Sequence, residues 1–98
     1  MLFAVIFKDK PEKGELRART LEAHVEWLDE NRETVLVAGS LRERPQDTPV
    51  GGLWVVDAPS KKAVKELLSS DPFFTCGLRQ DVQILHWNKA FPARKVAV

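Results

Sequence analysis

The chain of 98 residues is predicted to form an α+β fold in which two helices pack on one face of a four-stranded antiparallel sheet. Four short segments are apolar or rich in β-branched residues, as strands are. Two longer stretches repeat apolar side chains every three or four residues, as amphipathic helices do. Their order is strand, helix, strand, strand, helix, strand, which is the split βαβ order of the ferredoxin-like fold.

The first half of the chain contains one strand and one helix. Residues 2–7 read "LFAVIF", an apolar run of strand length, and the charged stretch "KDKPEKGE" with its proline and glycine predicts a loop after it. From about residue 16 to 31, Leu21, Val25 and Leu28 recur at helical spacing. We therefore expect an amphipathic helix whose apolar face contains these three side chains.

The second half contains the other three strands and the second helix. Strands are expected at 34–41 ("TVLVAGSL") and 51–58 ("GGLWVVDA"), because the two prolines of "RERPQDTPV" between them prevent a continuous ladder. A helix should follow from an N-cap near Ser60 through "KKAVKELLSS". The last strand is expected at 81–87 ("DVQILHW").

The corner "SSDPFFTCG" joins the second helix to the last strand. A residue before proline is pushed out of the α region, so the helix should stop near Ser70. Asp71 can then cap a new short turn that has Pro72 at its first position, and Gly77 can end it.

Length, charge and cysteine content limit the class of protein. A chain of this length is expected to form a single domain, with a core over about 2–91 and a C-terminal tail over 92–98. Fifteen basic and 14 acidic residues give a net charge of +1, so we expect no binding to nucleic acid or membranes. Residues 51–58 also lack the aromatic and basic pattern of RNA-binding proteins that share this topology.

A single cysteine, Cys76, excludes an internal disulfide and fits a cytoplasmic protein. No spacing of cysteines and histidines indicates a metal site. The apolar start of the chain is too short for a signal peptide or a membrane span.

The sheet should carry apolar side chains on both faces. Residues 2–7 and 35–38 are apolar at successive positions, and successive strand residues point to opposite faces. Two helices cover only one face. We therefore expect a homodimer in which a second copy covers the other face, sheet against sheet.

His24 is the first candidate for chemistry. It comes three residues after Leu21 and four before Leu28, at the border of the expected apolar face. Arg17 and Thr20 lie two turns and one turn earlier, where they could form a donor-rich stripe beside the histidine. Spacing alone leaves open a structural histidine that bonds a backbone carbonyl, with Arg17 as a solvated charge.

The motifs along the chain resemble those of the YciI-like family. They are "AHVEWL", "VLVAGSL", "GGLWVVDAPS", "SDPF" followed by "GL", and the closing "VQILHW", in order over about residues 2–91. The resemblance implies a dimeric α+β barrel and a histidine–aspartate pair acting as an acid–base dyad, at His24 and Asp71. The sequence departs from the pattern at Ser40, where proline often follows "AG", and in the turn "ENRE", where glycine is common. Ser40 could therefore change the pocket wall.

A histidine–aspartate pair suits proton transfer, because imidazole titrates near neutral pH and a carboxylate fixes its tautomer. The chain has no phosphate-binding glycine loop, dinucleotide fingerprint or nucleophile elbow, so we expect no cofactor. The resemblance then implies a lyase of dehydrochlorinase type or an isomerase acting on a small molecule. The candidate pocket walls, which could equally be ordinary core or interface aromatics, are Trp27, Trp54, Phe73 and Phe74.

Other readings stay open. The same cleft could belong to a non-catalytic dimeric module that binds a small ligand or stabilises a partner. We expect His86 to be structural and Cys76 to be a packed thiol. Arg42 and Arg44 are expected in a solvated loop, with a cationic lid over the pocket as the alternative.

Overall fold

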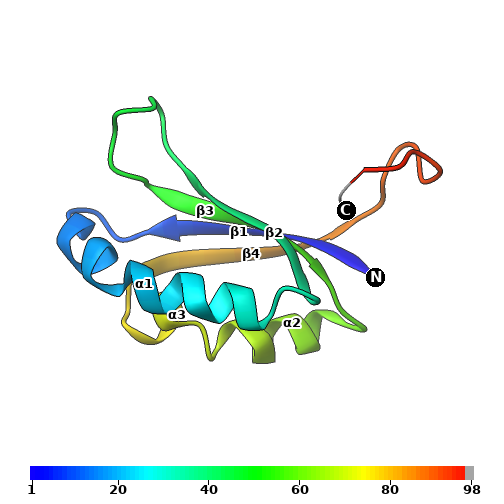
Figure 1. The fold of residues 1–98 in the computed structure, drawn as a ribbon, viewed down its shortest axis with the longest axis horizontal. Coiled ribbons are helices and arrows are strands. Elements are labelled where there is room, and N and C mark those ends of the chain that lie inside the picture. The colour runs from blue at the N-terminus through cyan, green and yellow to red at the C-terminus, as the bar shows by residue number, and fades with distance from the viewer. Residues whose placement is uncertain (97–98) are drawn as a thin grey trace.

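Residues 1–96, which the computed structural model describes, form a four-stranded antiparallel sheet with helices on one side (Figure 1). The strands lie in the order β2-β3-β1-β4, and every neighbouring pair is antiparallel. The predicted α+β, ferredoxin-like fold is therefore confirmed. The elements are β1 (Leu2–Asp9), α1 (Gly14–Glu30), β2 (Val35–Leu41), β3 (Gly51–Asp57), α2 (Lys61–Leu68), α3 (Pro72–Thr75) and β4 (Arg79–Trp87).

The corner after α2 has the predicted turn chemistry. The side chain of Asp71 accepts a hydrogen bond from the backbone N–H of Phe73 at 3.2 Å, and Pro72 occupies the first position of α3. Gly77 has a φ of 84°, in the left-handed region that glycine adopts without strain. A local sequence pattern therefore places Asp71 beneath the sheet.

The core lies between the sheet and the helices. Phe3, Val5 and Phe7 alternate along β1 and are buried, and they pair across the sheet with β3 residues that include Trp54. The helices cover this face, with Val64 of α2 fully buried against it. No helix within residues 1–96 is both long and apolar enough to cross a membrane.

The predicted inward face of α1 was right for Leu28, which packs against the core, but wrong for Leu21 and Val25. Leu21 and Val25 are 45% and 52% exposed, whereas His24 and Trp27 are buried. The inward side chains of α1 can be buried because their polar atoms form hydrogen bonds with residues outside the helix. Trp27 Nε1, for example, donates to Ser70 Oγ at 3.0 Å. The inward side is therefore rotated by part of a turn from the side that hydrophobic spacing alone predicts.

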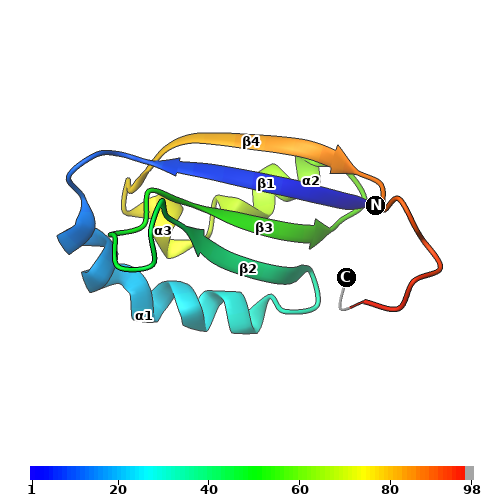
Figure 2. The same ribbon diagram turned by 90° about the horizontal axis from the view of Figure 1, so that it is seen from above.

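The other face of the sheet has no helix over it (Figure 2). The register brings apolar side chains from all four strands to this open face. Several are incompletely covered: Val37 is 45% exposed, Leu53 39% and Leu85 47%. The open face consists of Ala4, Ile6, Val37, Leu53, Val55 and Leu85.

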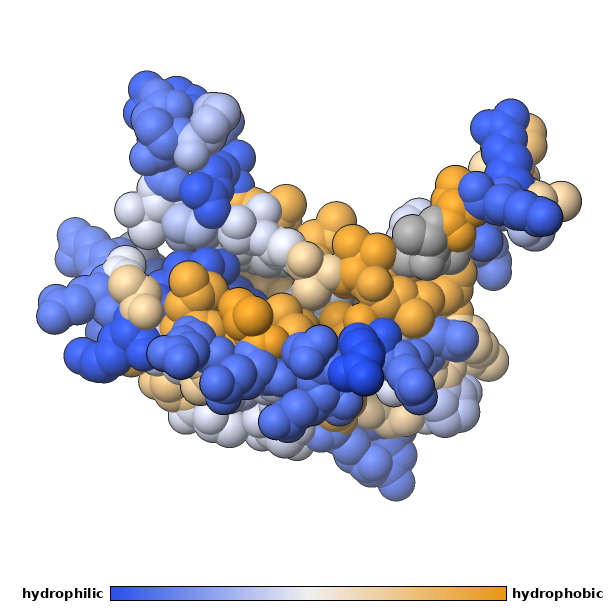
Figure 3. Space-filling model, viewed as in Figure 1, coloured by the Kyte–Doolittle hydropathy of each residue, from blue (hydrophilic) through white to orange (hydrophobic). Residues whose placement is uncertain are grey.

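Two segments project on the side of the open face, at opposite ends of the sheet (Figure 1). One is the loop 42–50 between β2 and β3, and the other is the irregular arm 88–96 after β4. In the space-filling view, hydrophobic residues gather between these two projections and the hydrophilic surface below (Figure 3). The tail predicted over 92–98 belongs to this arm as far as Val96, and its last two residues lie outside the described part of the chain.

Candidate active site

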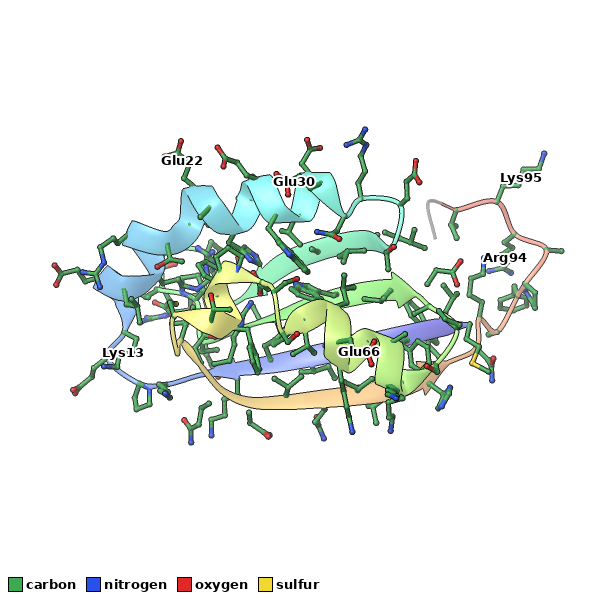
Figure 4. All side chains as sticks on the ribbon, turned by 90° about the horizontal axis from the view of Figure 1, so that it is seen from below. Lys13, Glu22, Glu30, Glu66, Arg94 and Lys95 are labelled. Atoms are coloured by element: carbon green, nitrogen blue, oxygen red, sulfur yellow. The ribbon has the colours of Figure 1, made fainter. Side chains whose placement is uncertain are left out.

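His24 and Asp71 meet inside the protein. His24 Nδ1 lies 2.6 Å from Asp71 Oδ1, and the two residues are 7% and 0% exposed. His24 comes from the inward side of α1 and Asp71 from the N-cap of α3, two helices that lie side by side beneath the sheet (Figure 4). Glu22, in contrast, points away from α3 on the outer side of α1 (Figure 4). The sequence-predicted pair is therefore in hydrogen-bonding contact.

Asp71 has two partners on one oxygen. Its Oδ1 faces His24 Nδ1 and also accepts the backbone N–H of Phe73. Its Oδ2 is buried and has no hydrogen-bond partner among residues 1–96. The residue therefore caps α3 and holds the imidazole with the same atom.

Aromatic rings surround the imidazole. The Phe73 ring stacks on His24 with centroids 3.9 Å apart and an interplanar angle of 14°. Trp54 lies further away at 6.3 Å and stacks in turn on Trp27 at 5.3 Å. Phe74 is 41% exposed and makes none of these ring contacts. Three of the four predicted wall residues thus lie around the histidine.

The second ring nitrogen of His24 is open to a partner. Nε2 makes no hydrogen bond within the described residues, and it is not one of their fully buried unpaired atoms. When Nδ1 donates its proton to Asp71, Nε2 has a lone pair and can accept a proton. The arrangement can therefore act as a general base through Nε2.

A second polar cluster lies close by. Asp9 accepts from Arg17 Nε at 3.2 Å through one oxygen and from Arg79 Nη1 at 2.7 Å through the other. Arg17 also donates to the carbonyl of Gly51 at 3.3 Å. Both guanidinium groups lie about 5 Å from the Phe73 ring, at 4.9 Å and 5.0 Å. One aromatic ring therefore contacts the histidine and both arginines.

Sequence reasoning selected Arg17 but missed Asp9 and Arg79. A signal was present, because Asp9 continues the period of two that buries alternate residues of β1. A charged residue at the next inward position requires a partner, and the register places Arg79 of β4 opposite it. That register could not be read from the sequence.

A cleft of about 910 Å³ opens at this end of the molecule. Its lining includes Asp9 and Arg17 together with the start of α1 and part of loop 42–50, but neither His24 nor Asp71. Phe73 is buried and does not line the cleft either, so the two polar clusters share only their contacts with its ring.

The remaining candidates lie away from the histidine. Ser40 is exposed and bonds Arg42 Nη2 at 2.7 Å, while Arg44 pairs with Asp47 in the same loop. These loop cations therefore bind acceptors of their own segment.

The two residues expected to be structural have ordinary surroundings. His86 packs on Phe3 with centroids 4.7 Å apart, and the Cys76 thiol contacts the carbonyl of Phe73 at 3.5 Å. Within residues 1–96, no three His, Cys, Asp or Glu side chains are grouped so that they could hold a metal ion.

The model of the YCII-related domain family matches residues 1–88. This chain belongs to that family. A comparison with curated proteins finds no match. The family assignment therefore rests on nearly the whole chain and agrees with the resemblance seen in its motifs.

Solved structures with the same fold include one dehydrochlorinase. It is the 5-chloro-2-hydroxyhydroquinone dehydrochlorinase of Burkholderia phenoliruptrix in complex with 2,5-dihydroxybenzoquinone, with a TM-score of 0.82 and 25% identity over 90% of this chain and 94% of that one. A protein of Bacteroides thetaiotaomicron described as a putative antibiotic biosynthesis monooxygenase has a TM-score of 0.56 and 21% identity over 98% of this chain and 94% of that one. A second protein described as such a monooxygenase has a TM-score of 0.53 and 17% identity over 92% and 99%. The two monooxygenases share the fold alone.

Proposed function

We propose that this YCII-related protein is a cofactor-independent enzyme that moves a proton on a small organic molecule. His24 would be its base or acid, and Asp71 would orient it. The observation that carries the proposal is the buried contact of 2.6 Å between His24 Nδ1 and Asp71 Oδ1. Similarity to a dehydrochlorinase supports it, since loss of HCl removes a proton from the substrate.

In the proposed step, Nε2 of neutral His24 takes a proton from the substrate. The electron pair of the broken bond forms a new double bond and expels a leaving group, or it moves to another carbon that is then protonated. The carboxylate of Asp71 stabilises the imidazolium, and burial strengthens this attraction. The imidazolium then returns its proton to solvent after elimination, or to the product in an isomerisation.

A binding module without catalysis is the second candidate. One observation favours it: the large cleft is lined by Arg17 but not by His24 or Asp71. Phe73 also covers one face of the imidazole. In this case the protein would hold a small ligand in the cleft, and the histidine pair would only connect α1 to α3.

We also propose that the working form is a homodimer joined through the open faces. Val37, Leu53 and Leu85 leave apolar surface exposed there, and large exposed apolar patches usually mark interfaces. A second copy supplies a complementary apolar sheet, because the same face pairs with itself around a twofold axis.

The proposed enzyme can be tested with two substrate sets. The purified protein is incubated with 5-chloro-2-hydroxyhydroquinone, the compound that names the dehydrochlorinase, and separately with a mixture of small metabolites. Chloride release and mass spectrometry measure turnover. His24→Gln should lower turnover by about 100-fold or more, the usual contribution of general acid–base catalysis, and Asp71→Asn should lower it less.

The control is His86→Gln, which changes the second of the two histidines, on β4. It should leave turnover unchanged. Equal turnover in the wild type and His24→Gln would exclude the proposed base. A ligand that binds without being converted, equally in both proteins, would select the binding module.

A further inference from the structure

We infer that the cleft beside Arg17 binds small organic anions, a carboxylate or phenolate attached to an apolar body. Arg17 is the donor to the anion, and Asp9 and Arg79 position it. The binding of such an anion does not depend on the proposed function. Only the statement that the anion is also the substrate rests on it.

The charges around Asp9 do not balance. Its single negative charge lies between Arg17 and Arg79, whose side chains are only 12% and 3% exposed. No other carboxylate within residues 1–96 forms an ion pair with either arginine. The cluster therefore has one excess positive charge in a poorly solvated place, which a bound anion would neutralise.

Donor groups remain unused in this cluster. Arg79 Nε is buried and has no hydrogen-bond partner in the described part of the chain. Arg17 uses Nε and Nη2, while its Nη1 makes no hydrogen bond within residues 1–96 and is not one of the fully buried unpaired atoms. Nη1 of Arg17 is therefore available to an anion in the cleft.

The position of Arg79 is built into the sheet. The guanidinium lies beside the Gly52 backbone, since a Cβ on Gly52 would be in ordinary van der Waals contact with Arg79 Nη2 at 3.5 Å. The guanidinium also lies over the Phe7 ring at 4.3 Å. Asp9 accepts from both arginines, so it connects the fixed Arg79 to Arg17, which lines the cleft.

The cleft suits an anion with an apolar body. Its volume of about 910 Å³ is within the range of small-molecule sites. Leu41 and Val50 supply exposed apolar wall, and Lys10 and Lys13 outnumber the one further carboxylate, Glu12, at the same end (Figure 4 labels Lys13). An organic anion satisfies both the walls and the charge.

Arg17 and His24 lie on the same helix and contact the same aromatic ring. Arg17 and His24 are seven residues apart on α1, about 10 Å along the helix axis, and both contact the Phe73 ring. Because Phe73 is only 1% exposed and does not line the cleft, it separates an anion bound at Arg17 from the histidine.

The experiment compares benzoate with benzamide, which have nearly the same shape and differ in charge. Binding to the full chain is followed by NMR titration of backbone amides. We expect benzoate to shift amides that line the cleft and benzamide to bind at least about tenfold more weakly, as for loss of one charge-assisted hydrogen bond. Arg17→Met should weaken benzoate binding by a similar factor.

Arg19→Met is the matched control, because it removes an exposed arginine of the same helix that does not line the cleft. It should leave benzoate binding unchanged. Should Arg17→Met not fold, Arg17→Lys keeps the charge but loses the Nε and Nη geometry and should bind benzoate more weakly than the wild type. The comparison of benzoate with benzamide needs no variant.

Equal binding of benzoate and benzamide, no binding of either, or equal losses in Arg17→Met and Arg19→Met would overturn the inference. The same titration in His24→Gln separates it from the proposed function. Benzoate binding that is kept in a protein without turnover supports the anion site and not the enzyme. Turnover that depends on His24 with no preference for anions supports the enzyme and overturns the anion site.

Discussion

Replacement of Asp71 tests whether this residue both caps α3 and holds His24. Asp71→Ala removes the cap, which costs about 0.5–2 kcal/mol, and leaves the buried His24 Nδ1 donor without a partner, which costs about 1–3 kcal/mol. We therefore expect its free energy of unfolding to fall by about 1.5–5 kcal/mol. In Asp71→Asn the amide oxygen can accept both hydrogen bonds, but the amide NH2 replaces the buried Oδ2, which has no partner, so the free energy should still fall, by less than in Asp71→Ala.

Urea unfolding measures these differences, with the fluorescence of the buried Trp27 and Trp54 as reporter. A double-mutant cycle of Asp71→Ala with His24→Ala should give a coupling energy of about 0.5–3 kcal/mol, as for residues in contact. The same cycle with His86→Ala is the control and should be additive. Equal losses in Asp71→Ala and Asp71→Asn, or no coupling to His24, would refute the reasoning.

Two further predictions concern the sheet. The wild-type protein should sediment at about twice its mass of 11.1 kDa at micromolar concentration. Val37→Asp on the open face should give dissociated or insoluble protein. A folded wild-type monomer would contradict the dimer. Gly51→Ala should lower the free energy of unfolding by about 1–3 kcal/mol or more, because its Cβ would lie 2.0 Å from the carbonyl oxygen of Phe7. Gly39→Ala, with nothing within 4 Å of the new Cβ, is the control and should be much milder in the same urea experiment.

Local patterns predicted the fold and one half of the site. The turn at Asp71 could be read from the sequence because an aspartate before proline acts on its immediate neighbours. The inward side of α1 could not be read from the sequence, because the buried His24 is stabilised by Asp71, a residue 47 positions away. Arg79 was missed for the same reason, since its partner Asp9 is 70 positions away and only the strand register brings them together.

The two projections at opposite ends of the open face have a consequence for assembly (Figure 1). A flat apolar sheet face alone would let a second sheet slide or rotate into many alignments. The loop 42–50 and the arm 88–96 project on the side from which a second copy would approach, so they would limit these alignments. Each copy has its helices on the other face, so a pair that closes in this way would offer no free sheet face to a third chain. A chain with only one open apolar sheet face would thus form a dimer and no larger assembly through that face.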